Sequence, residues 1–233
     1  MLDQAFDALK EYNWGTDPKV LKPIDDAIVS SHGDQAARQA LETRLAAVLG
    51  TDVPRDAKDY VCRKLMLIGS AQSVPALAKL LPSKDDSHMA RYALERIPAS
   101  AAAAAMRDAL PNIDDSLKIG VIASLGVRGD KESIPQLSNY LADENAAVAA
   151  AAAYALGDLA TSTAAKALAE TKPASEQAQF AATDASLSCA EALLADGKNG
   201  EALAIYKGFI GADHPKHVRL AATRGMLACS GKK

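Results

Sequence analysis

A leucine that recurs every 31 residues is the feature that most constrains the fold of this chain. The segments RYAL, IASL, AYAL and DASL end at positions spaced by 31 residues, namely Leu94, Leu125, Leu156 and Leu187. A fixed period of this length is typical of repeat proteins, in which each unit buries its apolar face against its neighbours. We therefore expect these four leucines to occupy equivalent core positions in a stacked array.

A second internal match supports the repeat. The segments SVPALAKLL and SIPQLSNYL place Pro75 and Pro135 at the same point, 60 residues apart and close to two periods. Proline is favoured in the first turn of a helix, where its missing N–H has no partner to lose. We predict that each proline begins the second helix of a repeat.

The periodicity predicts an all-α fold. Apolar residues recur every three or four positions, and alternating strand patterns are nearly absent. Short glycine- and proline-containing breaks separate the periodic segments. The predicted helices are 2–12, 18–31, 34–49, 56–69, 73–81, 86–97, 100–110, 115–127, 132–141, 145–159, 162–170, 175–196, 199–210 and 215–229.

One predicted helix contains five consecutive alanines, Ala149 to Ala153. Alanine is the best helix former, but its side chain buries little apolar area and is too small to fill a core. In a stacked array, small side chains let helices approach closely and gain dispersion from many short contacts. We expect Tyr154, Leu156 and Leu159 to supply the larger packing groups.

The repeat unit resembles the HEAT-repeat family. A first helix ends in leucine and often glycine, as in SLG at 124–126 and ALG at 155–157, and a leucine-rich second helix and an acidic turn follow. SHMARYALERI and AAVAAAAAYALGDL match the first helix of that family, and Arg91 stands where it often has a basic residue. The resemblance covers residues 56–171 and implies a right-handed α-solenoid of antiparallel helix pairs.

The flanking segments are expected to complete one continuous solenoid. Residues 1–55 are predicted to form an N-terminal helical cap, because the end of a solenoid must cover the apolar face of the first repeat. Residues 172–233 are predicted to form further helices, of which 197–215 also resembles the second helix of a tetratricopeptide repeat. That segment has a glycine, alanine and aromatic spacing carried by Gly197, Ala202 and Tyr206.

Charge and hydropathy exclude some partners. The chain has 26 basic and 29 acidic residues and a net charge of −3, whereas dedicated nucleic-acid binders carry a basic surplus. No apolar run is long enough to span a membrane. The N-terminal segment is acidic and lacks the apolar stretch of a signal peptide, so we predict a cytoplasmic protein. An exported protein or a piece of a longer one is the alternative.

Residues able to carry chemistry do not form a catalytic pattern. Cys62, Cys189 and Cys229 are widely spaced within helical patterns, so we interpret them as buried free thiols. His214 and His217 are close enough to suggest a metal site, but exposed turn residues are the better interpretation. We predict no catalytic, cofactor-binding or metal-binding residues. Trp14 follows Asn13 in a turn, and we expect it to plug the cap rather than to anchor a partner.

The sequence therefore predicts a non-catalytic scaffold that binds a protein or peptide on the concave face of the solenoid. Helical spacing selects the second-helix residues expected to line that face, namely Lys79, Arg107, Gln136, Asn139, Tyr140 and Lys166. The alternative is an accessory enzyme like the HEAT-type phycobilin lyases, which would hold a chromophore or a peptide substrate.

Overall fold

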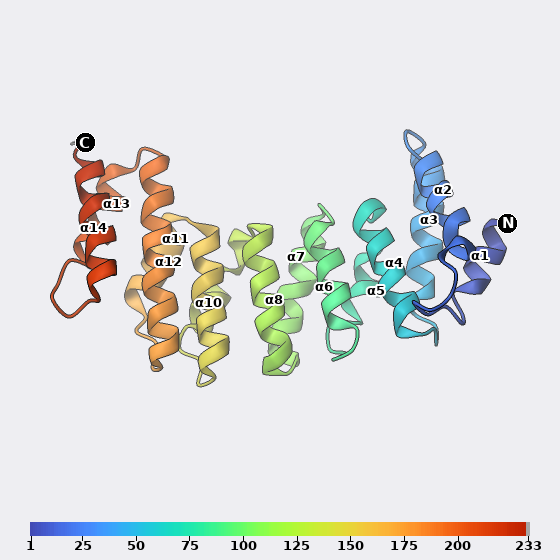
Figure 1. Ribbon diagram of the computed structural model, residues 1–233, viewed down its shortest axis with the longest axis horizontal. Coiled ribbons are helices and arrows are strands. Elements are labelled where there is room, and N and C mark those ends of the chain that lie inside the picture. The colour runs from blue at the N-terminus through green and yellow to red at the C-terminus, as the bar shows by residue number, and fades with distance from the viewer. Residues whose placement is uncertain (232–233) are drawn as a thin grey trace. The chain divides into compact units, whose positions relative to one another are not determined.

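The computed structural model describes residues 1–231, and over that range the chain is α-helical with short 3₁₀ segments and no strand (Figure 1). The chain forms two compact units, Met1–Val121 and Ile122–Lys233. The boundary falls within helix α8 (Asp115–Arg128). None of the described helices is both long and apolar enough to cross a bilayer.

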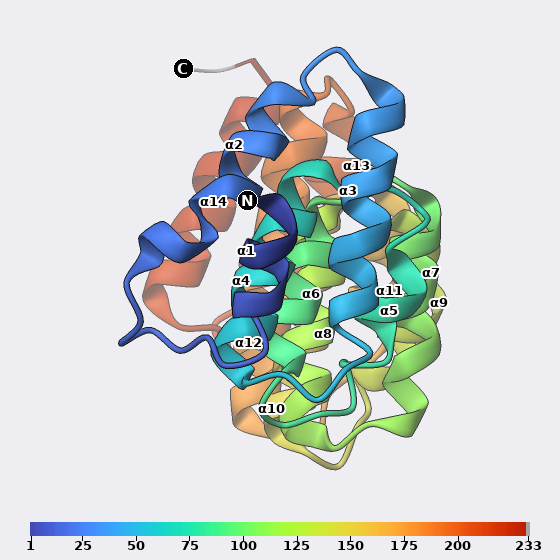
Figure 2. The ribbon, with the colours of Figure 1, turned by 90° about the vertical axis from the view of Figure 1, so that its right-hand side faces the viewer.

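The first unit arranges its helices in two layers. In one layer α4 packs against α6, and in the other α5 packs against α3 and α7 (Figure 2). The helices are α1 (Leu2–Ala8), α2 (Lys22–Ser30), α3 (Gln35–Val48), α4 (Arg55–Ile68), α5 (Val74–Ala78), α6 (Ser87–Arg96) and α7 (Ser100–Ala109), with 3₁₀ turns at Pro18–Leu21 and Leu110–Asn112.

The second unit repeats this arrangement. Helix α12 packs against α10 and α14 in one layer, and α11 packs against α9 in the other (Figure 1). The elements are a 3₁₀ turn at Lys131–Ser133, α9 (Ile134–Tyr140), α10 (Ala146–Leu159), α11 (Ser162–Glu170), α12 (Glu176–Ala195), α13 (Asn199–Lys207) and α14 (Lys216–Cys229). Because the connections are short, consecutive helices are antiparallel, as in an α-solenoid.

The predicted helices agree with this structure except near the N-terminus and at the ends of α5 and α13, which stop three residues before the predicted positions 81 and 210. Helix α1 ends at Ala8 and not at residue 12, because the bonds that follow are of the tighter three-residue type, such as Leu9 N–H to the Phe6 carbonyl at 3.3 Å. The predicted helix 18–31 divides into a 3₁₀ turn and α2. Pro23 has no N–H to donate, so it suits the first turn of a new helix and not the middle of a longer one.

The 31-residue repeat holds for three of its four leucines. Leu94, Leu125 and Leu156 are fully buried, but Leu187 is half-buried, so its assignment to the core is wrong. The buried stripe of α12 passes instead through Ala182, Ala185, Ser186, Cys189 and Ala190. Leu187 lies off that stripe. The predicted positions of Pro75 and Pro135 are confirmed, since both lie in the first turn of their helices.

The alanine-rich helix packs as predicted, through close backbone approach. A Cβ built on Gly157 would lie 2.9 Å from the Cβ of Ala185, and one on Gly126 would lie 2.9 Å from the Cα of Ala155. The buried alanines of α10 are Ala149, Ala150, Ala152, Ala153 and Ala155. Leu156 and Leu159 are buried beside them, but Tyr154 is 44% exposed, so its predicted packing role is wrong.

A buried carboxylate positions α5 in the first unit. Glu42 on α3 is 1% exposed and accepts hydrogen bonds from the N–H of Ser70 at 2.6 Å and the N–H of Ser73 at 3.1 Å. The Ser70 hydroxyl also donates to it at 3.0 Å. These charge-assisted bonds satisfy N–H groups at the start of α5, which a helix terminus otherwise leaves unpaired. Glu42 thus ties α3 to the next helix pair.

Candidate binding surfaces

In the first unit, the two sequence-predicted contact residues lie on neighbouring second helices. Lys79 follows the last residue of α5 and is exposed, and Arg107 is half-buried on α7. Because α5 packs beside α7, both residues belong to the same layer. The prediction that they bind a partner stays a prediction.

In the second unit, the other four predicted residues lie on α9 and α11, which also pack side by side. Asn139 and Lys166 are exposed, whereas Gln136 and Tyr140 are half-buried. The Lys166 ammonium lies 3.6 Å from a carboxylate oxygen of Glu170 on the same helix, and both side chains are mostly exposed. Such a pair contributes little to stability, so Lys166 can exchange this partner for another.

A cavity of about 490 Å³ opens between α11, α12 and α13 in the second unit. Helix α11 contributes Leu168 and Ala169, α13 contributes Ile205, and α12 contributes the buried Ala182 and Ser186. The linker 171–173 and the turn that carries Phe209 and His214 complete the lining. Sequence periodicity could not reveal this cavity, because it depends on how far α11 and α13 stand apart.

The polar groups in this cavity bond mainly within the chain. The Gln179 amide donates to the Pro173 carbonyl at 2.9 Å, and the Thr183 and Ser186 hydroxyls donate to carbonyls one turn back in α12. The His214 ring packs against Phe209 with centroids 5.2 Å apart. The lining includes Lys172 but no carboxylate. The cavity is therefore suited to an apolar group with a neutral or negative neighbour.

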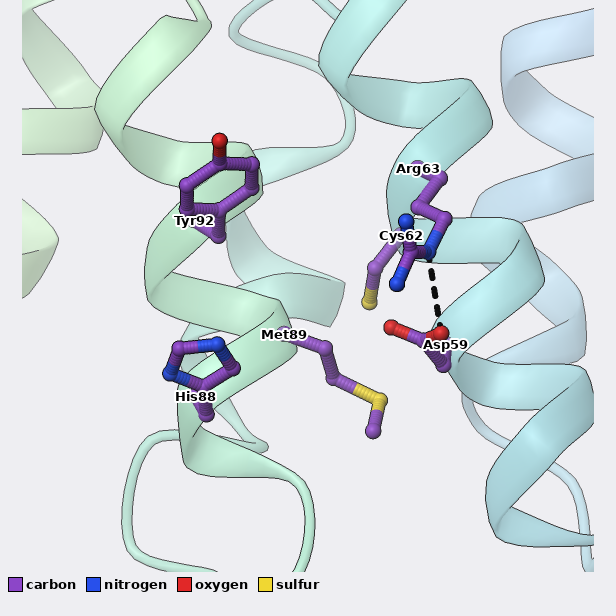
Figure 3. Close-up of a pocket in the computed structure, with 6 residues that line it drawn as sticks. All are labelled: Asp59, Cys62, Arg63, His88, Met89 and Tyr92. Carbon is purple, nitrogen blue, oxygen red and sulfur yellow. Dashed lines mark hydrogen bonds and ion pairs between the residues drawn. The ribbon is translucent and has the colours of Figure 1, made fainter.

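A second cavity, of about 280 Å³, lies between α4 and α6 in the first unit. Figure 3 shows Asp59, Cys62 and Arg63 of α4 facing His88, Met89 and Tyr92 of α6 across it. The Asp59 carboxylate accepts a hydrogen bond from Arg63 Nε at 2.9 Å. His88 and Tyr92 stack with ring centroids 6.3 Å apart. The cavity thus has a sulfur-lined interior and an aromatic and basic rim.

Trp14 lies next to this rim and is 53% exposed, so the prediction that it plugs the cap is wrong. Tyr12, only 3% exposed, fills that role and contacts the Trp14 ring edge-on at 5.7 Å. The Trp14 backbone N–H donates to Asp56 at 3.1 Å, and the Arg63 guanidinium lies 5.9 Å from the indole centroid. The local turn pattern suggested both roles, and only the tertiary contacts distinguish them.

The cysteines are free, as predicted, and two of them are poor nucleophiles. Burial raises the pKa of the Cys62 thiol to about 12 and that of Cys189 to about 11. Both thiols are almost fully buried, and the Cys189 thiol donates to the Leu156 carbonyl at 3.7 Å. Cys229 is half-buried, so the prediction that it is buried is wrong. Since the thiolate is the reactive form, Cys62 and Cys189 act as small apolar side chains.

The two C-terminal histidines considered for a metal site do not converge. His214 lines the α11–α13 cavity, with its Nε2 3.1 Å from the Gly208 carbonyl oxygen. His217 lies on α14 and lines a different cavity with Phe180 of α12. Among residues 1–231 no cluster of three or more histidine, cysteine or acidic side chains has a metal-binding arrangement.

The stacked helix pairs define the protein as a member of the α-solenoid class. Within it, residues 103–186 match the family model for HEAT repeats, as the sequence resemblance predicted. The comparisons do not confirm the tetratricopeptide resemblance of residues 197–215.

One solved structure, entitled "Lipid-protein interactions in lipovitellin", is similar with a TM-score of 0.58 and 15% sequence identity over 95% of this chain. The chain spans 28% of the length of that lipovitellin chain, and at this identity the likeness shows the fold alone. Among curated proteins no sequence matches.

Proposed function

We propose that this protein is a non-catalytic scaffold that binds a protein or peptide partner through its second helices. HEAT repeats commonly serve as scaffolds for protein interactions. The observation that carries the proposal is the cavity of about 490 Å³ that is lined by α11, α12 and α13. It combines an apolar interior with polar surroundings, which is the usual composition of a ligand site.

The cavity accepts a large apolar side chain of the partner. Leu168, Ile205 and Phe209 provide apolar walls, and the buried Ala182 leaves room between α11 and α13. Because the Gln179, Thr183 and Ser186 groups already donate within the chain, an apolar side chain displaces few of their hydrogen bonds. The partner anchors here by apolar burial.

The residues predicted from sequence supply polar contacts within their own units. Tyr140 and Arg107 belong to residue types that are enriched among interface hot spots, so we expect them to contribute most. Lys166 can release Glu170 and pair with a partner carboxylate. We treat the contribution of each unit separately, with Lys79 and Arg107 in the first unit and the other four in the second.

The test fills the cavity and leaves the core unchanged. Ala169 lines the cavity but is exposed, so Ala169→Trp occupies the space without overpacking the interior. The matched control is Ala228→Trp, at an exposed alanine of α14. Wild type, variant and control serve as bait in affinity capture with quantitative mass spectrometry. We expect wild type and control to recover the same partner, and Ala169→Trp to recover at least about tenfold less.

Two outcomes contradict the proposal. If no recovered protein depends on Ala169, the cavity is not the anchor site. If the purified protein carries a stoichiometric chromophore or metal, the accessory-enzyme alternative is favoured. The combined Arg107→Ala, Tyr140→Ala and Lys166→Ala variant then distinguishes the polar contacts from the anchor, because it leaves the cavity open and is expected to fold normally.

A further inference from the structure

We propose that the first unit carries a separate docking site for an acidic peptide segment with one large apolar side chain. The site is the aromatic–arginine patch, which we define as Trp14, Arg63, His88, Tyr92 and Arg96 around the α4–α6 cavity. It lies on the first-helix layer, so it does not depend on the second-helix function proposed above.

The exposed side chains of the patch are all aromatic or basic. Trp14 is 53% exposed and Tyr92 is 43% exposed, and Arg63, His88 and Arg96 are exposed as well. By contrast, the large exposed apolar side chains of the described chain include none from α5, α7, α9, α11 or α13. Tryptophan, tyrosine and arginine are the residue types most enriched in interface hot spots. The patch therefore has the composition of an interface centre.

The acidic groups near the patch are already engaged or half-buried. The Asp59 side chain is 15% exposed and bonds to Arg63, and Asp56 accepts the Trp14 backbone N–H. Glu95 is half-buried. Burial lowers the pKa of Arg91, and the negative charge of Glu95 opposes that shift. A basic partner would be repelled by the positive charges of Arg63 and Arg96 at the surface. An acidic partner gains charge-assisted hydrogen bonds from the same two side chains.

The patch is also held in place before any partner binds. The Trp14 ring rests edge-on against the buried Tyr12, and Asp59 fixes Arg63 with a 2.9 Å bond. The Arg96 guanidinium lies 5.9 Å from the centroid of the Tyr92 ring. Side chains that are already ordered lose less entropy on binding, so more of the contact energy appears as affinity.

The cavity between α4 and α6 provides the position for the apolar side chain. Its volume of about 280 Å³ is bounded inside by Cys62 and Met89, both almost fully buried. Methionine adapts its shape to the group it meets, and its sulfur makes favourable contacts with aromatic rings. An apolar side chain that enters here stands between Arg63 on one helix and Tyr92 on the other, as Figure 3 shows.

The probe is a phage-displayed library of random twelve-residue peptides, selected on the full chain. We expect the enriched sequences to combine acidic residues with one aromatic or large aliphatic residue. A selected peptide, labelled with fluorescein, is then titrated against variants by fluorescence polarisation. Tyr92→Ala and Arg63→Ala are each expected to weaken binding at least about tenfold, and added salt is expected to weaken binding to wild type.

Tyr154→Ala is the matched control, because Tyr154 is a tyrosine of α10 with a similar exposure of 44% and lies outside the patch. We expect it to bind the peptide as wild type does. Circular dichroism shows whether each variant is folded, and Trp14→Ala gives an independent measurement if Arg63→Ala destabilises α4. Enrichment of basic or uncharged peptides, or equal binding by Tyr92→Ala and Tyr154→Ala, would overturn the proposal.

Discussion

The interface between α10 and α12 and the interface between α4 and α6 both join first helices of consecutive pairs, yet their side chains differ. At α10–α12 the facing residues include glycine and alanine, and Gly157 approaches Ala185 so closely that a Cβ on Gly157 would lie 2.9 Å from that of Ala185. At α4–α6 the facing residues include Cys62, Met89 and Tyr92, and they enclose about 280 Å³.

The difference shows how one repeat fold provides both closed and open interfaces. Small side chains let two helices approach until their backbones are in contact, and the gain is dispersion spread over many atoms. Larger and charged side chains hold the helices apart at the rim, because Asp59, Arg63 and His88 must keep access to water or to each other. A closed interface stabilises the stack, and an open one is available to a partner.

The largest loss of stability is expected when a large side chain is removed from the closed interface. Leu156 is fully buried among alanines that cannot expand into a vacancy. Leu156→Ala should therefore destabilise the protein by about 4 kcal/mol, measured by urea unfolding. Leu187→Ala, at the half-buried position one period later, should cost about 1 kcal/mol. Equal losses would mean that Leu187 belongs to the core after all.

A smaller loss is expected when the closed interface is forced apart. Gly157→Val adds two methyl groups and a Cβ against the backbone of Ala185, which lies 3.0 Å from the built Cβ at its Cα. We expect a cost of about 3 kcal/mol, since overpacking is only partly relieved by small shifts. Gly200→Val on α13 is the control, because a Cβ there meets nothing within 4 Å. If the two substitutions had the same cost in thermal unfolding, the close approach would be wrong.

The smallest effect is expected when the open interface receives a larger side chain. Cys62→Met adds volume directed into the α4–α6 cavity, which is large enough to take it. We expect the free energy of unfolding to change by less than about 1 kcal/mol, measured by urea unfolding. A loss comparable to that of Gly157→Val would show that this interface is as closed as α10–α12.

Much of the fold follows from the sequence because its determinants are local or periodic. The apolar periodicity predicts the helices, and Pro75 and Pro135 mark helix starts because a missing N–H matters only there. The close packing of the alanine-rich helix also follows from the sequence. Alanine side chains are too small to fill a gap between helices, so such a helix gains packing energy only when the backbones approach closely. Five of the six predicted contact residues lie on second helices and Lys79 directly follows one, although their partner is untested.

What the sequence does not reveal depends on contacts between distant segments. In the sequence, Glu42 is an ordinary polar residue of a helix. It can be buried because its carboxylate accepts hydrogen bonds from Ser70 and Ser73, which lie 28 and 31 residues further along the chain. Leu187 fits the 31-residue period, but it lies off the buried stripe of α12. His88, Tyr92 and Arg96 are spaced by four along α6, but no such spacing connects them to Trp14 in the loop or to Arg63 on α4.

The most direct test of the account is the affinity of the Cys62→Met variant for the selected acidic peptide. The account claims that the open α4–α6 interface is the space that a partner fills. A methionine placed in that space should leave the protein folded and weaken peptide binding by about tenfold relative to wild type. A folded variant that binds the peptide with unchanged affinity would contradict this claim.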